Sequence, residues 1–156
     1  MTIQYVEIDN HLEEKIIEQY GSWVRDYNCL VRGQNCFLIA AVDGDTVAGF
    51  AALHPAQWIP PLDQYEDAFI EVIEVAKEYQ RRGIGSHLVK LMEDYAASKG
   101  FRQIRSWSSE DKSEALHMWY KLGFCMCPAA QLGPSVKPGY ENQQIVGYYY
   151  GKVLNP

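Results

Sequence analysis

The chain has 156 residues, of which 47% are hydrophobic and 22% are charged, and its formal net charge at pH 7 is -6. This length and composition predict one globular domain over residues 1–156 and exclude a disordered chain. The negative charge argues against nucleic acid as a partner, because nucleic-acid binding relies on clustered Lys and Arg. A cationic partner is the better expectation.

The N-terminus has no basic segment followed by an apolar one, and nowhere do about 18 apolar residues follow one another. We therefore expect a cytoplasmic protein without a membrane partner, and we allow for a homodimer. The cysteines do not have the spacing of zinc ligands, so we predict no metal and four buried, reduced thiols, Cys29, Cys36, Cys125 and Cys127.

Apolar alternation and helical spacing predict the elements of the first part of the chain. They are a strand over 3–8, a helix over 11–20 ended by Gly21, strands over 36–42 and 46–53, and a strand over 67–75. The Asp43-Gly44 pair favours a tight hairpin between the second and third strands. Three prolines, Pro55, Pro60 and Pro61, predict a loop before the fourth strand.

The second part of the chain begins with a helix whose apolar residues from Ile84 to Tyr95 share one face, and Lys99-Gly100 closes it. A strand over 101–107 follows, then a helix opened by a capping box, Asp111 to Glu114, and ended by Gly123. Later come a strand from Phe124, a loop over 128–139 and a strand over 144–153. This order predicts an α/β (α+β) domain whose central sheet is mixed and partly parallel.

The segment Gln80-Arg81-Arg82-Gly83-Ile84-Gly85-Ser86 lies between the predicted fourth strand and the helix after it. Glycines let the backbone approach an anion closely, and the N–H groups and dipole of a helix start attract negative charge. The segment therefore predicts a phosphate site. It matches neither the dinucleotide fingerprint, which needs a third glycine where Leu88 stands, nor the P-loop, which needs Gly-Lys-Ser/Thr.

The run IEVAKEYQRRGIGSHLV resembles motif A of the GCN5-related N-acetyltransferases, whose signature Gln/Arg-x-x-Gly-x-Gly/Ala is matched by Gln80, Gly83 and Gly85. The later segment ALHMWYKLGF is similar to motif B of the same family, and both segments stand in the family's order. The resemblance spans roughly residues 36–124, and residues 3–20 fit the family's first strand and helix. It implies acetyl-CoA as co-substrate.

The resemblance also implies which residues hold the coenzyme. Backbone groups of Ile73, Glu74 and Val75 are expected to face the acyl carbonyl and the pantetheine arm. The pyrophosphate is expected to lie on the loop residues Gln80, Arg81, Arg82, Gly83, Ile84, Gly85 and Ser86. We expect the Val75 N–H to stabilise the oxyanion that forms when an amine attacks the thioester.

Two residues are candidates for moving protons during the reaction. Glu71 is expected on the same strand face as Ile73 and Val75, where it acts as general base or as an anion that positions the amine. A salt-bridged or merely solvated carboxylate is the alternative, and Glu74 on the other face is the weaker candidate. The motif B tyrosine that protonates the thiolate in many family members falls on Trp119, so Tyr120 from an altered register, or solvent, is expected to supply this proton. No role is assigned to His54, His87 or His117.

These observations favour an N-acetyltransferase that moves an acetyl group from acetyl-CoA to a primary amine of a small cationic metabolite. A protein N-terminal or lysine acetyltransferase is the alternative within the same class of enzyme. A non-catalytic acyl-CoA-binding regulatory module is the alternative from another class, because Trp119 departs from the family pattern. We expect loops over 56–66 and 128–141 to determine the acceptor, and Trp58 and Tyr65 to pack over the cleft.

Overall fold

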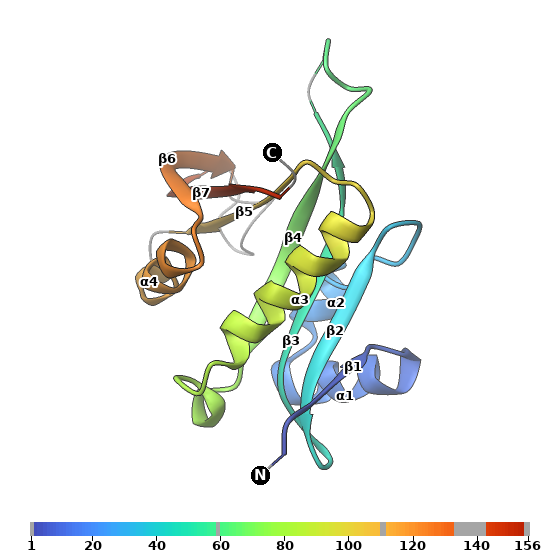
Figure 1. Ribbon diagram of the computed structural model, residues 1–156. Helices are drawn as coiled ribbons and strands as arrows, with labels where there is room; N and C mark the ends of the chain where they lie inside the picture. Colours follow the sequence, from blue (N-terminus) through green and yellow to red (C-terminus); the bar gives the residue numbers. More distant parts are fainter. Residues whose placement is uncertain (1, 59, 110–111, 133–142, 155–156) are drawn as a thin grey trace. The chain divides into compact units, whose positions relative to one another are not determined.

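The computed structural model describes residues 2–58, 60–109, 112–132 and 143–154. They form two compact units, which can be followed by colour in Figure 1. The first contains the described residues up to Ile104 together with Leu154, and the second contains those of Arg105–Val153. That residues 1–156 act as a single domain stays a prediction.

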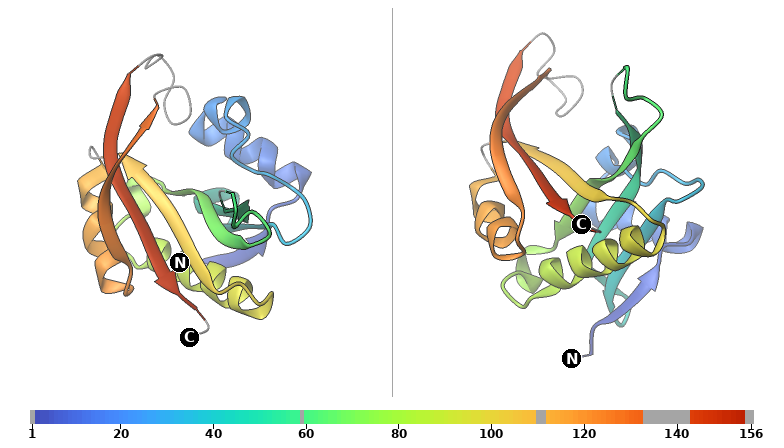
Figure 2. Two further views of the ribbon diagram at one scale, coloured as in Figure 1. Left: turned by 90° about the horizontal axis from the view of Figure 1, so that it is seen from above. Right: turned by 45° about the horizontal axis from the view of Figure 1, so that its top comes forward.

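The first unit is a four-stranded antiparallel sheet covered by helices on both faces (Figures 1 and 2). Phe37 stacks on Tyr95 of the long helix α3 on one face, while Phe50 packs against Tyr20 and Trp23 of the N-terminal helices on the other. The elements are β1 (Gln4–Glu7), α1 (Asn10–Tyr20), α2 (Trp23–Asp26), β2 (Phe37–Asp43), β3 (Thr46–Gln57), β4 (Glu66–Val75), the 3-10 turn η1 (Lys77–Tyr79) and α3 (Ile84–Ser98).

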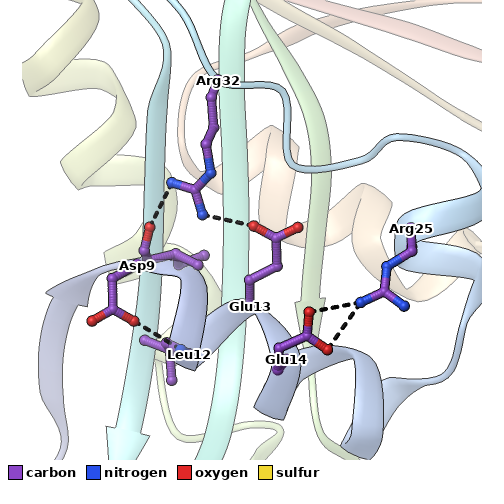
Figure 3. Close-up of polar contacts among 7 residues, drawn as sticks. Asp9, Leu12, Glu13, Glu14, Arg25 and Arg32 are labelled. Carbon is purple, nitrogen blue, oxygen red and sulfur yellow. Dashed lines mark hydrogen bonds and ion pairs between the residues drawn. The ribbon is translucent and has the colours of Figure 1, made fainter.

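Polar contacts fix the start of α1 (Figure 3). The Asp9 carboxylate accepts a hydrogen bond from the Leu12 N–H at 2.8 Å, as an N-cap does, and Gly21 ends the helix as predicted. Arg32, from the segment before β2, donates to the Ile8 carbonyl and to Glu13. These contacts tie the first strand, the first helix and the segment over 27–36 together.

The strand β3 runs to Gln57, so the prediction that Pro55 lies in a loop is wrong. Pro55 pairs with Ala68. Hydrogen-bonded and non-hydrogen-bonded pairs alternate along an antiparallel ladder, and the Trp58 N–H donates to the Tyr65 carbonyl. Counted from that bond, Pro55 and Ala68 form a non-hydrogen-bonded pair. On its other side β2 has already ended, since its first residue, Phe37, pairs with Leu53. The missing N–H of proline therefore costs no ladder hydrogen bond.

A β-bulge interrupts β4 at Glu71. Leu53 pairs with Ile70 and Ala52 with Val72, which leaves Glu71 as an extra residue opposite β3. Val72 packs in the core cluster on the α1 and α2 side, whereas Val75 lies against Ile84 of α3 beside Gly49. The bulge breaks the regular alternation of side chains along β4. The prediction that Glu71 shares a strand face with Val75 is therefore wrong.

Gly49 lies where β3, β4 and the first turn of α3 meet. A Cβ atom there would come within 2.8 Å of the Glu74 carbonyl oxygen and 3.3 Å of Val75 Cγ2. We expect Gly49→Ala to lower the free energy of unfolding by about 1–3 kcal/mol, because overpacking forces the backbone to shift. The matched control is Gly151→Ala, where a Cβ would meet nothing within 4 Å. Urea denaturation checks this, and equal stability of both variants would contradict it.

The second unit contains most of β5 (Gln103–Ser109), then α4 (Ser113–Lys121), β6 (Cys125–Leu132) and β7 (Gln144–Val153). The last two strands form an antiparallel hairpin in which Pro128 pairs with Tyr148, so Pro128 belongs to a strand and not to the predicted loop. The predicted cap residue Asp111 lies outside the described residues. In the described part of the chain no helix is long and apolar enough to cross a membrane.

The cysteines differ from one another in burial. Cys29 is buried and Cys36 half-buried, in agreement with the prediction. Cys125 and Cys127 are exposed, so the prediction of buried thiols is wrong for these two. They alternate with the half-buried Met126 along β6 and therefore lie on the outward face of that strand.

Candidate functional site

The loop after β4 is exposed and contains two residues with positive φ. Its first residue, Gln80, is tied back to the strand by a hydrogen bond of 3.0 Å from its side-chain amide to the Val75 carbonyl. Arg81 and Gly83 both have positive φ values, 62° and 81°. A glycine adopts the second of these without strain, and the four residues from Gln80 to Gly83 are exposed.

The helix α3 begins directly after Gly83. Its first intrahelical bond runs from the His87 N–H to the Gly83 carbonyl at 3.0 Å, so the N–H groups of Ile84, Gly85 and Ser86 come before the helical ladder. Together with the helix dipole they form an electropositive end suited to an anion. The side chain of Ile84 is buried, which anchors this end against the sheet.

Arg82 is held over the ring of Tyr79, with 5.5 Å from its guanidinium carbon to the ring centroid. The Tyr79 hydroxyl in turn donates a hydrogen bond of 3.1 Å to Asp43 at the end of β2. Burial and the Asp43 carboxylate both raise the pKa of Tyr79, so its hydroxyl stays protonated and remains a donor. This chain of contacts orients a cationic side chain of the loop after β4.

The backbone of β4 offers polar groups at its C-terminal end. The Ala76 N–H donates to the Ala48 carbonyl, and hydrogen-bonded pairs alternate along an antiparallel ladder. Ile73 and Val75 therefore direct their N–H and carbonyl groups away from β3, whereas Glu74 directs its backbone toward Phe50. This geometry supports the Val75 N–H as an oxyanion donor, and it gives the Glu74 backbone a ladder role in place of the expected coenzyme contact.

The bulge residue Glu71 contacts a histidine from the neighbouring strand. Its Oε2 lies 2.9 Å from His54 Nε2, and His54 Nδ1 lies 2.8 Å from the Pro55 carbonyl oxygen. His54 is on the face of Phe50 and Ala52, because β3 alternates regularly there. Glu71 is thus directed to the face that α1 and α2 cover, on the opposite side of the sheet from α3.

The same face of β4 carries further acidic groups. Asp67 pairs with Ala56 on this face, is buried, and accepts a hydrogen bond of 2.7 Å from Gln103. Burial, with help from the carboxylates of Glu71 and Glu74, raises the pKa of the Cys29 thiol to about 11. Cys29 is therefore an unreactive thiol at neutral pH.

Comparison with known families shows where the chain belongs. A model of the acetyltransferase (GNAT) family matches residues 3–124. The chain belongs to this family. The solved structure of Arabidopsis thaliana NAA60 in complex with a bisubstrate analogue is similar, with a TM-score of 0.75 and 15% identity over 99% of each chain. This likeness confirms the predicted fold class, an α/β domain with a mixed, partly parallel sheet.

Two curated proteins named as acetyltransferases are similar to this chain in sequence. A Xenopus tropicalis protein named "Probable N-acetyltransferase 14" is 32% identical over 92 residues, which cover 59% of this chain and 42% of that protein. The streptothricin acetyltransferase of Streptomyces lavendulae is 32% identical over 91 residues, covering 58% of this chain and 44% of the enzyme. The chain thus spans less than half the length of these two relatives.

The GNAT motif B residues lie on α4 in the second unit. Trp119, at the family's tyrosine position, is buried, stacks on Tyr150 at 5.1 Å between ring centroids and meets the edge of Phe124 at 4.8 Å. It is a core residue of this unit. The neighbouring Tyr120 is 73% exposed, and its role as proton donor stays a prediction. The described residues contain no group of three or more His, Cys, Asp or Glu side chains arranged for a metal ion.

Arg81 is the GNAT loop residue whose replacement tests coenzyme binding separately from chemistry. We expect Arg81→Ala to raise the Kd for acetyl-CoA roughly tenfold or more, the usual loss for a charge-assisted hydrogen bond, with little change in kcat. Calorimetric titration and steady-state kinetics check this. Arg25→Ala is the matched control, because Arg25 is an exposed arginine paired with Glu14 on α1. A slower turnover with unchanged affinity would contradict the role of Arg81.

Two contacts of the site were missed from the sequence. His54 received no role because it is distant from Glu71 in the chain, and only the register of β3 on β4, bulge included, brings the two together. Tyr79 was also missed, since nothing in its local sequence indicates that it reaches Asp43. Trp58 and Tyr65 are partly exposed at the end of the β3–β4 hairpin, and their expected place over the cleft stays a prediction.

Proposed function

We propose that this protein transfers an acetyl group from acetyl-CoA to a primary amine of a small cationic metabolite. Coenzyme binding is assigned to the loop from Gln80 to Ser86 with the start of α3, and oxyanion stabilisation to the Val75 N–H. Family membership and the electropositive loop support the coenzyme. The amine is assigned to the side of β4 that carries Glu71.

The chemistry requires a base because an alkyl amine is mostly protonated near neutral pH and attacks a thioester only when neutral. Glu71 is suited to this role because the bulge directs its carboxylate to the face that α1 and α2 cover, and because its side chain remains 34% exposed there. The attack turns the thioester carbonyl into an oxyanion, which a preorganised backbone N–H stabilises. The leaving thiolate takes its proton from solvent or from Tyr120.

A single observation carries the choice of a cationic acceptor. Between Arg32 and Lys77 the chain contains no Lys or Arg, and the stretch includes β2, β3 and β4. The acidic residues of this stretch therefore outnumber its basic ones, and Asp45 among them forms an ion pair with Lys15 at 3.2 Å. They are Asp43, Asp45, Asp63, Glu66, Asp67, Glu71 and Glu74. Such a field attracts a positively charged amine and repels a carboxylate-bearing one.

The test offers three groups of acceptors with acetyl-CoA and follows the release of free thiol. The groups are polyamines, amino acids with a free carboxylate, and short peptides with an N-terminal or lysine amine. We expect the highest kcat/KM for polyamines and a decrease as salt rises. Preference for peptides would favour a protein acetyltransferase. Coenzyme binding without thiol release from any acceptor would favour a regulatory acyl-CoA-binding module.

A further inference from the structure

His54 and Glu71 form a pair that is anchored on both sides. The imidazole sits at the end of the regular part of β3, with Phe69 beside it at 5.6 Å between ring centroids. One ring nitrogen meets the Pro55 carbonyl and the other meets the Glu71 carboxylate. Of the two side chains His54 is the less exposed, at 23% against 34% for Glu71. The Glu71 carboxylate is therefore the more accessible of the two groups.

The partners of the ring determine where its protons lie. A backbone carbonyl only accepts hydrogen bonds, so Nδ1 carries a proton and donates it to Pro55. The other nitrogen, Nε2, faces Glu71 Oε2. Nε2 has a lone pair when the ring is neutral and a second proton when the ring is an imidazolium. A proton on Nε2 gives an ion pair at 2.9 Å, which is the distance of a charge-assisted hydrogen bond. The described residues form no hydrogen bond to Glu71 Oε1, which leaves this oxygen for the amine.

The groups around the pair favour an additional positive charge. Glu74 follows on β4 and Cys29 comes from the segment after α2, where the two carboxylates act on its thiol. That thiol stays neutral, because its pKa is about 11. Among these groups only the carboxylates are charged near neutral pH, so a proton arriving on His54 is stabilised.

We propose that His54 and Glu71 act as one proton acceptor for the amine, with Glu71 contacting the amine and His54 storing the proton. The inference rests on the proposed function. The ammonium group donates a proton to the Glu71 carboxylate at Oε1, and rotation of the resulting carboxyl group brings this proton to face the unprotonated His54 Nε2. Its transfer to Nε2 leaves a neutral amine beside an imidazolium and a carboxylate.

The proton count of the whole reaction is balanced. The ammonium nitrogen loses two protons as the amide N–C bond forms and the C–S bond breaks. One proton is held by His54 and returns to solvent after the product leaves. The second is lost from the tetrahedral intermediate, and the departing thiolate takes up one proton to become free coenzyme A. His54 is thus a positioning residue for the carboxylate as well as the proton store.

The test compares wild type with His54→Gln over a range of pH, using the acceptor with the highest activity. Ionisation of the acceptor affects both proteins equally, so the ratio of their kcat/KM values isolates the pair. A histidine titrates near 6.5 and a lone carboxylate near 4.3 in unperturbed peptides. We therefore expect a ratio of roughly ten above about pH 7.5, since a weaker base is a poorer catalyst. The ratio should fall to one or below near about pH 5, where an unperturbed histidine already carries both protons and accepts no other.

The matched control is His11→Gln, because His11 is an exposed histidine of α1 and its replacement should leave the profile unchanged. A second measurement needs no acceptor. The ring signals of His54, assigned by their loss in His54→Gln, are followed by NMR as pH changes. In Glu71→Gln their midpoint should move to lower pH, because the carboxylate no longer stabilises the imidazolium.

The outcomes distinguish this inference from the proposed function. A ratio that depends on pH as described, with the NMR midpoint shifted, supports the pair. A ratio that is constant with pH, or an unshifted midpoint in Glu71→Gln, overturns it even if the protein acetylates amines. A shifted midpoint in a protein that binds acetyl-CoA but acetylates nothing overturns the proposed function and with it the catalytic role of the pair.

Discussion

Replacement of Gly83 by valine is expected to remove most of the affinity for acetyl-CoA while the protein stays folded. Gly83 has a φ of 81° and a ψ of 0°, and a Cβ built there meets nothing within 4 Å. The added side chain therefore does not clash, but a β-branched residue in this conformation costs about 1–3 kcal/mol. We expect the loop to relieve this strain by adopting other φ and ψ angles. That change moves the N–H groups that are assigned to the pyrophosphate.

A change of conformation in this loop should raise the Kd for acetyl-CoA by at least about tenfold, since each 1.4 kcal/mol is one factor of ten. The increase in melting temperature that acetyl-CoA produces in wild type should disappear correspondingly. Gly100→Val is a close control, because Gly100 has a φ of 82° and equally open surroundings at the far end of α3. It should lose similar stability and keep its affinity. Normal binding by folded Gly83→Val would refute the loop assignment.

Replacement of Glu71 by glutamine is expected to lower turnover by roughly 10²-fold or more, the usual contribution of a general base. The variant keeps the size of the side chain and a polar contact with His54, so folding and acetyl-CoA affinity should be retained. The loss should shrink at high pH, because the free amine is then abundant without a base. Steady-state kinetics from neutral to alkaline pH check both the size and the trend.

The comparison variant is Tyr120→Phe, which should lower turnover by less than about tenfold if solvent protonates the thiolate. The structure supports this expectation in that Tyr120 is largely exposed and Trp119 is part of an aromatic core. A severe loss in Tyr120→Phe beside nearly normal activity of Glu71→Gln would place the proton chemistry on α4 and not on β4.

Much of the first unit could be predicted because its signals are local. The helix over 11–20 follows from its apolar spacing and ends at Gly21, and the Asp43-Gly44 turn follows from the conformation that glycine allows. The phosphate loop is equally local, since glycines and the start of α3 are contiguous in sequence. Short elements escaped prediction, as α2 and η1 are too short for periodicity to be recognised.

The position of Glu71 could not be predicted because it depends on pairing between strands. An extra residue in β4 reverses which side chains face α3, and nothing in the run FIEVIEV reveals a bulge. Glu71 was predicted to be a base because it was expected on the same strand face as Val75. The structure places it on the opposite face, in contact with His54. In the same way, the ladder accommodates Pro55 only because β2 ends at Phe37.

The central claim is that the chain joins the acetyl group of acetyl-CoA to an amine, and mass spectrometry of the acceptor tests it most directly. Wild type and Glu71→Gln are incubated with a polyamine and with enough acetyl-CoA to saturate both proteins. The account predicts acetylated polyamine with wild type and roughly 10²-fold slower formation with Glu71→Gln. Wild-type protein that binds acetyl-CoA and yields no acetylated product from polyamines, amino acids or peptides would contradict it.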